Sequence, residues 1–481
     1  MGHGKIFSLL ALDVGRSIPA EVFQGKMSRI CFVVDSGTAI RNLLRTNVLT
    51  SLINDHLDDV SIYSPINDRQ FKSELGGNEV EVLSFPQSKK TLSAKLLSSL
   101  ACDCWALRHN LFTYINKRRA LRGFALKKIL IRILAGNLSP KNLLKLESKL
   151  KNMARNQSVV NDPSKLLDSN IDLLVYSTMF SPSHSLELAA EDLGIPTVAV
   201  IMSWDNLTTK GPLRLNPNSF IVWNDVMRTE LIQYHGCDPE DIMVSGIPQF
   251  DLYANRDQLR SRRDFCEKWN LNPDHKIISY TTGTDQTSPF DEDLIWDLVE
   301  GIEKSVFDIK SQLVIRPHPK DSPSSYNQLA KHPCVTVQLP GRRGNSSDSW
   351  NPTQEDMVDL AELMLHSDTN VNVASTITLD AASFDTPIVN IAYDGSKRRP
   401  YNRSIARYYQ YEHYRPITDS GGVKIAFSKE ELWAETKHYL HNPSTDEEGR
   451  RIIREKMIGD LDGSSGLRIA SFLSRISARL A

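Results

Sequence analysis

Short apolar runs alternate with amphipathic segments along most of this chain. The first run, 30–34, ends in a turn containing glycine and is followed by apolar residues at helical spacing over 39–53. Similar runs occur at 60–63, 80–83, 171–177, 197–202, 220–223 and 242–247. A buried strand followed by a helix, repeated several times, predicts a parallel sheet covered by helices on both faces.

A second series of the same kind follows a polar, charged stretch at 255–272, which we interpret as a connector. Its predicted strands lie at 276–280, 312–316, 335–339, 369–373 and 386–391. The sequence therefore predicts an α/β protein with two Rossmann-like domains, 27–254 and 273–425, that face each other across a cleft. Helices are expected over 426–481, and residues 1–26 are interpreted as a loose leader.

The regular pattern stops at 89–155, a basic segment that we interpret as a helical insertion in the first domain. Sixteen Lys or Arg residues stand against Asp103 and Glu147 here, a local charge of +14 in a chain whose net charge is −1. The apolar spacing predicts two or three helices. The charge has two interpretations. The cations could form a solvent-exposed helical face, or the part 126–134 could be an interfacial helix that binds anionic lipid. Nucleic acid is not expected, because no nucleic-acid-binding motif accompanies the charge.

Composition excludes several other classes of protein. With 40% hydrophobic and 24% charged residues, the chain is neither disordered nor fibrous. Its six scattered cysteines form no disulfide or metal-binding pattern. No apolar run reaches the length of about 20 residues that crosses a bilayer. We therefore expect a cytoplasmic protein, peripheral on the inner face of the plasma membrane if the basic segment binds lipid.

Polar side chains follow three predicted strands of the second domain, and the carboxyl ends of parallel strands meet at one crevice. The residues in question are Thr282, Gly283, Thr284, Arg316, His318, Lys320, Ser375, Thr376 and Asp380. Small hydroxyl residues at the start of a helix, with cationic donors opposite them, are typical of a phosphate site. The carboxylate of Asp380 could accept hydrogen bonds from ribose hydroxyls. The pattern predicts a nucleotide site, although each residue also has a structural explanation as a cap, a turn or a packed side chain.

Several of these motifs resemble a known family. They are Arg316-Pro-His-Pro-Lys320, Ser375-Thr376 with Leu379-Asp380-Ala381-Ala382, Thr386-Pro387-Ile388-Val389, and His413-Tyr414 before Gly421-Gly422-Val423. Together they resemble the C-terminal half of bacterial surface-polysaccharide glycosyltransferases related to the CDP-glycerol glycerophosphotransferases. The resemblance implies a GT-B fold and metal-independent transfer without a cofactor. It also implies a CMP-, CDP- or UDP-linked donor and a lipid-linked or glycan acceptor.

Transfer to a hydroxyl requires a base, which we expect at the strand ends of the first domain. Asp35, Asp205 and His184 are the candidates, and each could instead be a turn or cap residue. Two other functions stay open at this point. A UDP-sugar 2-epimerase shares the two-domain fold, and a nonenzymatic nucleotide-sugar binding protein could retain it.

Overall fold

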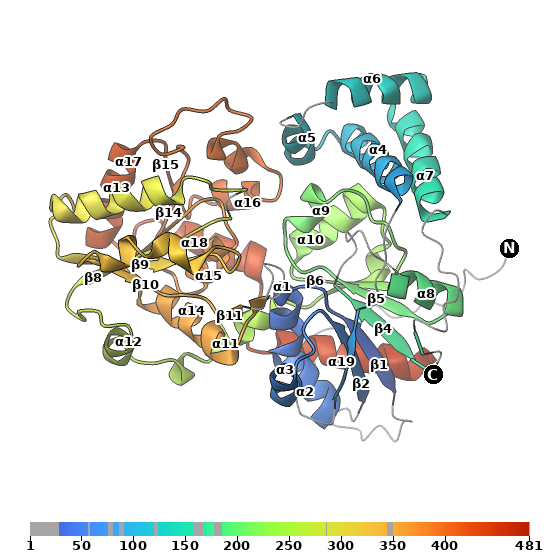
Figure 1. The fold of residues 1–481 in the computed structure, drawn as a ribbon, viewed down its shortest axis with the longest axis horizontal. Coiled ribbons are helices and arrows are strands. Elements are labelled where there is room, and N and C mark those ends of the chain that lie inside the picture. The colour runs from blue at the N-terminus through green and yellow to red at the C-terminus, as the bar shows by residue number, and fades with distance from the viewer. Residues whose placement is uncertain are drawn as a thin grey trace.

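The computed structural model describes residues 28–480 except 56–57, 76–79, 86–90, 120–123, 157–166, 169, 178–184, 285 and 344–349. Two α/β domains lie side by side, each built on a parallel sheet with helices on its faces (Figure 1). The predicted fold class is therefore confirmed. None of the helices in the described ranges is long and apolar enough to cross a membrane.

The first domain contains a seven-stranded parallel sheet in the order β3-β2-β1-β4-β5-β6-β7. Its strands are β1 (Arg29–Val33), β2 (Asp59–Ser64), β3 (Val80–Ser84), β4 (Leu173–Tyr176), β5 (Thr197–Val200), β6 (Ser219–Val222) and β7 (Ile242–Val244). In the register, Phe32 of β1 lies between Ile62 of β2 and Val175 of β4. All residues of β4 and β5 are buried, as expected for strands covered on both faces.

The second domain contains a six-stranded parallel sheet in the order β10-β9-β8-β13-β14-β15. Its strands are β8 (Lys276–Thr281), β9 (Ser311–Arg316), β10 (Val335–Val337), β13 (Thr369–Asn372), β14 (Ile388–Ile391) and β15 (Lys424–Ala426). A separate antiparallel pair joins β11 (Arg342–Arg343) to β12 (Trp350–Asn351). The sequence pattern missed β15 because only one of its three residues is buried.

Helices connect the strands and cover both sheets. In the first domain they are α1 (Gly37–Ala39), continued by a π-helical turn η1 (Ile40–Leu44), α2 (Asn47–Asn54), α3 (Arg69–Glu74), α8 (Ser185–Leu193), α9 (Asn206–Thr209) and α10 (Asp225–Glu230). In the second domain they are α13 (Asp291–Glu303), α14 (Gln354–His366), α15 (Ile377–Ser383), η9 (Ile405–Gln410), α16 (Arg415–Thr418), α17 (Lys429–His441) and α18 (Glu447–Ile453). The segments η5 (Pro248–Phe250), α11 (Asp251–Ala254) and α12 (Arg262–Lys268) connect the two domains.

The C-terminal helix α19 (Ser465–Leu480) returns to the first domain, where it packs against α2 (Figure 1). Its buried residues Ile469 and Leu473 join the apolar core of that domain. Asp251 accepts hydrogen bonds from the backbone N–H groups of Ser465 (2.9 Å) and Gly466 (2.7 Å), which lie in the first turn of α19. This carboxylate caps the helix and fixes the point where the chain crosses back.

The described residues of the basic segment form four helices, one more than the largest number predicted. They are α4 (Leu92–His109), α5 (Phe112–Arg119), α6 (Phe124–Ala135) and α7 (Pro140–Asn156). The break after α4 falls at Asn110, whose backbone is left-handed (φ 50°). The sequence pattern missed this break because no glycine or proline marks it. Both acids of the segment are paired inside it, Asp103 with Arg118 (2.8 Å) and Glu147 with Arg108 (3.0 Å). The pairing of these two acids with cations of the same segment leaves the remaining charge of the segment positive.

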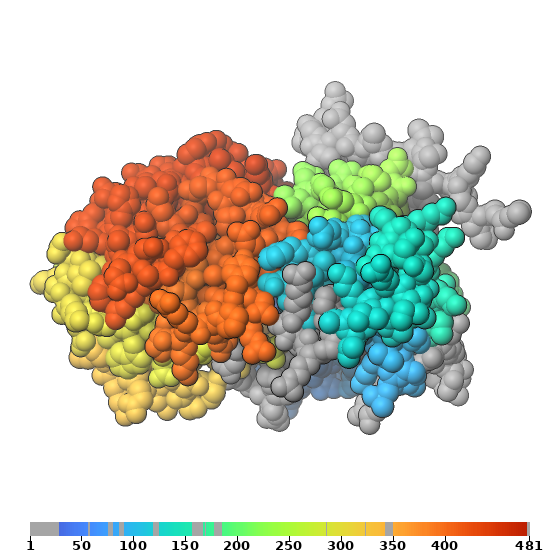
Figure 2. All heavy atoms as spheres, turned by 90° about the horizontal axis from the view of Figure 1, so that it is seen from above, coloured from blue at the N-terminus to red at the C-terminus, as the bar shows by residue number. Residues whose placement is uncertain are grey.

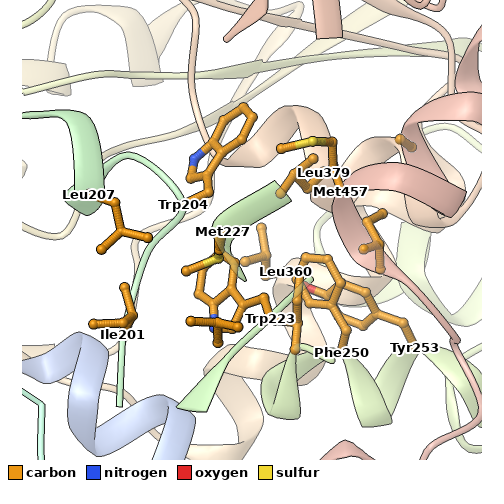
Figure 3. Packing of buried hydrophobic residues seen from close by; sticks show 14 of the residues in the cluster. Ile201, Trp204, Leu207, Trp223, Met227, Phe250, Tyr253, Leu360, Leu379 and Met457 are labelled. Carbon is orange, nitrogen blue, oxygen red and sulfur yellow. The ribbon is translucent and has the colours of Figure 1, made fainter. Parts of the chain in front are cut away.

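Buried apolar residues from both domains form one cluster between them (Figure 3). Trp204 and Trp223 come from the first domain, and Leu360 and Leu379 from the second. The insertion adds a polar contact, because the Glu412 carboxylate of the second domain accepts from the Phe112 (2.5 Å) and Thr113 (2.9 Å) N–H groups at the start of α5. These contacts fix how the two sheets face each other.

Candidate active site

A cavity of ≈ 530 Å³ opens between the two domains, at the carboxyl ends of strands from both sheets. Seven of the predicted site residues line it: Asp35, Thr282, Arg316, His318, Lys320, Ser375 and Thr376. Asp35 follows β1 of the first domain, whereas Arg316 ends β9 and the other five follow strands β8, β9 and β13 of the second. The structure thus brings together residues from three strand ends of one domain and one of the other.

His318 is held in a defined orientation by its neighbours. Its backbone N–H donates to the Thr282 hydroxyl (2.7 Å), which in turn donates to Asp321 (2.8 Å). The Lys320 N–H donates to Nδ1 of the His318 ring (3.1 Å). Because Nδ1 accepts a hydrogen bond, the neutral imidazole carries its proton on Nε2. The ring therefore has one N–H donor, on Nε2.

Ser375 and Thr376 lie in the turn between β13 and α15. The preceding Ala374 has a left-handed backbone (φ 22°), an unusual conformation for a residue with a side chain. Its N–H donates to the hydroxyl of Tyr409 (3.3 Å). Within the described part of the chain, the N–H groups of Ser375 and Thr376 have no hydrogen-bond acceptor. The turn thus presents two backbone donors at the cavity, an arrangement that suits an anion.

Arg316 lines the cavity, but other protein groups already engage its guanidinium. Nη1 donates to the Gln338 side chain (3.1 Å), and Nη2 forms an ion pair with Asp356. Asp356 also accepts from the Gly341 N–H (2.7 Å). Arg316 is buried, and its pairing fixes the loop after β10 as a wall of the cavity.

Gly283 and Thr284 were predicted to bind the nucleotide, but they do not line the cavity. The Gly283 N–H donates to Asp291 (2.7 Å), and the Thr284 N–H donates to the Thr287 hydroxyl (2.9 Å). Burial raises the pKa of Asp291 to about 6, although hydrogen bonds from Ser288 and Gly283 among others oppose this shift. In the structure, the turn positions the preceding Thr282.

Asp380 lies behind the cavity wall. It is buried, and the Tyr253 hydroxyl, whose residue does line the cavity, donates to its carboxylate (2.5 Å). Burial raises the pKa of Asp380 to about 6, against the opposing effects of the Tyr253 hydrogen bond and the nearby Arg41 guanidinium. Its contact with a ribose stays a prediction.

Asp205 precedes α9 and is not part of the cavity lining. Hydroxyl groups of Ser203 (2.5 Å) and Thr209 (3.2 Å) donate to its two oxygens. Burial alone would raise the pKa of Asp205, but His413, the Ser203 hydrogen bond and nearby lysines together lower it. His184, the third predicted base, lies outside the described residues.

Many lining residues were not predicted as site residues, among them the four polar or aromatic residues Arg41, Gln249, Thr281 and Trp350. Gln249 Oε1, Thr281 Oγ1 and Trp350 Nε1 are buried and have no hydrogen-bond partner among the residues that the structure describes. Buried polar atoms without partners are costly, so their presence here favours a polar ligand. Of these four, Gln249 and Thr281 had a sequence signal, because each lies within two residues of a predicted strand end.

Two parallel-sheet domains with a cavity at their facing strand ends have the architecture of the GT-B fold. The model of the family described as CDP-Glycerol:Poly(glycerophosphate) glycerophosphotransferase matches residues 212–475, which is more than half of the chain. The chain therefore belongs to this family and is a transferase. No curated protein matches the sequence significantly.

Solved structures show the same fold at low identity. The S. aureus MnaA–UDP complex has a TM-score of 0.53 at 12% identity, over 92% of this chain and 95% of that chain. The UDP-GlcNAc 2-epimerase from Neisseria meningitidis bound to UDP-GlcNAc has a TM-score of 0.52 at 11% identity, over 93% of this chain and 100% of that chain. At this identity the similarity concerns the fold.

Proposed function

We propose that this protein transfers glycerol phosphate, or a related activated group, from a CDP-linked donor to a hydroxyl of a lipid-linked acceptor. The observation that supports it most is the cavity between the domains, where donors for phosphate from the second domain lie opposite a carboxylate of the first. Membership in the glycerophosphotransferase family favours the CDP-linked donor over UDP- or CMP-linked ones.

The second domain supplies groups that suit the donor's phosphates. The N–H groups of Ser375 and Thr376 are without acceptors among the described residues, and the neutral His318 ring has its N–H on Nε2. Lys320 adds a cation to the same lining. Hydrogen bonds to a phosphate strengthen as its charge grows, so these groups stabilise the departing nucleotide.

In this reaction the acceptor hydroxyl oxygen attacks the phosphorus atom that carries glycerol. A new P–O bond forms, the bond from that phosphorus to the oxygen of CMP breaks, and CMP leaves with the bonding electrons. The hydroxyl proton passes to a base. Proton removal by a positioned carboxylate accelerates such a step by about 10²–10⁴-fold.

We assign the base to Asp35. It lines the cavity together with His318 and Ser375, whereas Asp205 lies outside the lining. The lowered pKa of Asp205 also makes it a weaker base. We infer that Asp205 instead stabilises the loop after β5 at the start of α9.

Helix α6 supports a membrane-bound acceptor. Its residues Leu126, Ile129, Leu130, Ile133 and Leu134 are 42% to 72% exposed and recur at helical spacing, so an apolar stripe faces outward. The helix lies at the outer edge of the insertion, far from both sheets (Figure 1), and the insertion forms part of the surface seen from above in Figure 2. Such a stripe beside cationic residues fits an anionic lipid bilayer.

The cations of α6 differ in their surroundings. Lys127 donates to Ser99 (2.8 Å) and lies 3.9 Å from Asp103, so it belongs to the packing of the insertion. Lys128 and Arg132 are exposed. These two residues, rather than Lys127, are the ones expected to meet lipid headgroups, each contributing about 1 kcal/mol near the surface.

A transfer assay tests the proposed function. The purified protein is incubated with radiolabelled CDP-glycerol, CMP-sugar or UDP-sugar, each with and without bacterial lipid extract. We expect label to enter the lipid fraction from CDP-glycerol, only when lipid is present. A new nucleotide-sugar product formed without lipid would indicate an epimerase, and binding without turnover would indicate a nonenzymatic protein. Either result would contradict the proposal.

A further inference from the structure

Arg41 is a cation in the cavity that forms no ion pair with any of the residues that the structure describes. It lies on η1, the helical turn that follows β1 and α1, and its side chain lines the cavity. Its Nε donates to Asn42 (3.2 Å). No carboxylate of the described residues forms an ion pair with Arg41, and its two Nη groups have no hydrogen-bond acceptor there.

Two carboxylates near Arg41 already interact with other protein groups. Asp356 is paired with Arg316, and Asp380 accepts from Tyr253 behind the wall. Burial lowers the pKa of Arg41, although Asp380 and other acidic groups oppose that shift, and an arginine stays protonated in proteins. A partly buried cation without a partner is unfavourable, so this position favours binding of an anion.

Contacts with the second domain hold Arg41 in place. Its guanidinium carbon lies 5.8 Å from the centre of the Trp350 ring. Trp350 comes this close because residue 37 is glycine: a Cβ there would lie 2.4 Å from the Trp350 carbonyl oxygen and 2.5 Å from its ring. The packing of Gly37 against Trp350 therefore places Arg41 at the donor side of the cavity.

We infer that Arg41 binds the diphosphate of the nucleotide donor, as the phosphate ligand that the first domain contributes. The inference rests on the proposed function for the identity of the donor. Arg316, the arginine that the sequence pattern suggested, has both Nη groups engaged, whereas those of Arg41 have no partner in the described structure. A planar guanidinium holds two phosphate oxygens in a fixed bidentate geometry, whereas a lysine ammonium acts as a point charge without this fork.

Calorimetry with cytidine, CMP and CDP, and with UDP as a second diphosphate, tests this role. Hydrogen bonds to a charged group correspond to about 10- to 100-fold in affinity. We expect Arg41→Gln to weaken CDP binding by this factor and cytidine binding by less than about two-fold. The CDP affinity of Arg41→Lys should lie between those of the wild type and Arg41→Gln, because lysine keeps the charge but lacks the planar fork. Arg228→Gln, a matched change on α10 outside the cavity, should bind CDP like the wild type.

The outcomes separate this inference from the proposed function. CDP affinity within two-fold of wild type in Arg41→Gln overturns the inference, as does a wild-type protein that binds neither CDP nor UDP. An equal loss for cytidine and CDP also overturns it, because that pattern indicates a misshapen cavity. If Arg41→Gln selectively weakens CDP binding but the wild type transfers nothing from CDP-glycerol, the inference stands and the proposed function fails.

Discussion

Replacing Asp380 by asparagine should stabilise the protein, and the gain should depend on pH. Asp380 is buried, and its folded-state pKa is raised from the ordinary value of 3.8 to about 6. The folded state therefore disfavours the carboxylate. The free energy of unfolding is therefore highest below pH 4, where Asp380 is protonated, and the contribution of this group is lost as the pH rises through 6. The difference between the two pKa values corresponds to about 3 kcal/mol.

Asparagine cannot ionise, and its side-chain oxygen can still accept from Tyr253. The stability of Asp380→Asn relative to wild type should thus rise from about zero at pH 4 to at most about 3 kcal/mol at pH 8. Melting temperatures of both proteins across this pH range measure the difference. Asp225→Asn, a change at a side chain that is 84% exposed, serves as the control. A difference that is constant with pH would refute the reasoning.

Other changes test the cavity, the insertion and the chemistry. Gly37→Ala should cost about 1–3 kcal/mol of stability, because its Cβ would collide with Trp350. An unchanged melting temperature would show that Trp350 can move aside without loss of stability. Lys128→Glu with Arg132→Glu should release the protein from phosphatidylglycerol vesicles in co-sedimentation at low salt, whereas unchanged binding would contradict a lipid-facing α6. Asp205→Asn should retain far more turnover than Asp35→Asn, and the reverse order would move the base to Asp205. Chelation with EDTA should leave the transfer rate unchanged, and a loss that Mg²⁺ restores would contradict metal-independent transfer.

The fold could be predicted because its strands are buried on both faces. Continuous apolar runs such as those of β4 and β5 stand out from the amphipathic helices around them. The pattern was weaker where burial is partial, so β15 was missed. The break between α4 and α5 depends on the backbone of Asn110, which no composition signal marked.

Apart from Asp35, the part of the cavity lining that could be predicted lies within the second domain. His318 and Ser375 follow strands of one sheet, so their proximity follows from topology. Gln249 and Trp350 reach the cavity only because the domains pack in one particular orientation, which sequence patterns do not specify. Asp380 lies at the predicted helix start, but the Tyr253 hydroxyl from the interdomain segment engages it behind the wall.

The central claim, that His318 of the second domain binds the donor while Asp35 of the first supplies the base, is tested most directly with two variants. Nucleotide affinity by calorimetry and turnover with CDP-glycerol are measured for His318→Ala and Asp35→Asn. We expect turnover to fall by about 100-fold or more in both. CDP affinity should fall in His318→Ala and stay within about two-fold of wild type in Asp35→Asn. CDP binding lost in Asp35→Asn and kept in His318→Ala would contradict this division of roles.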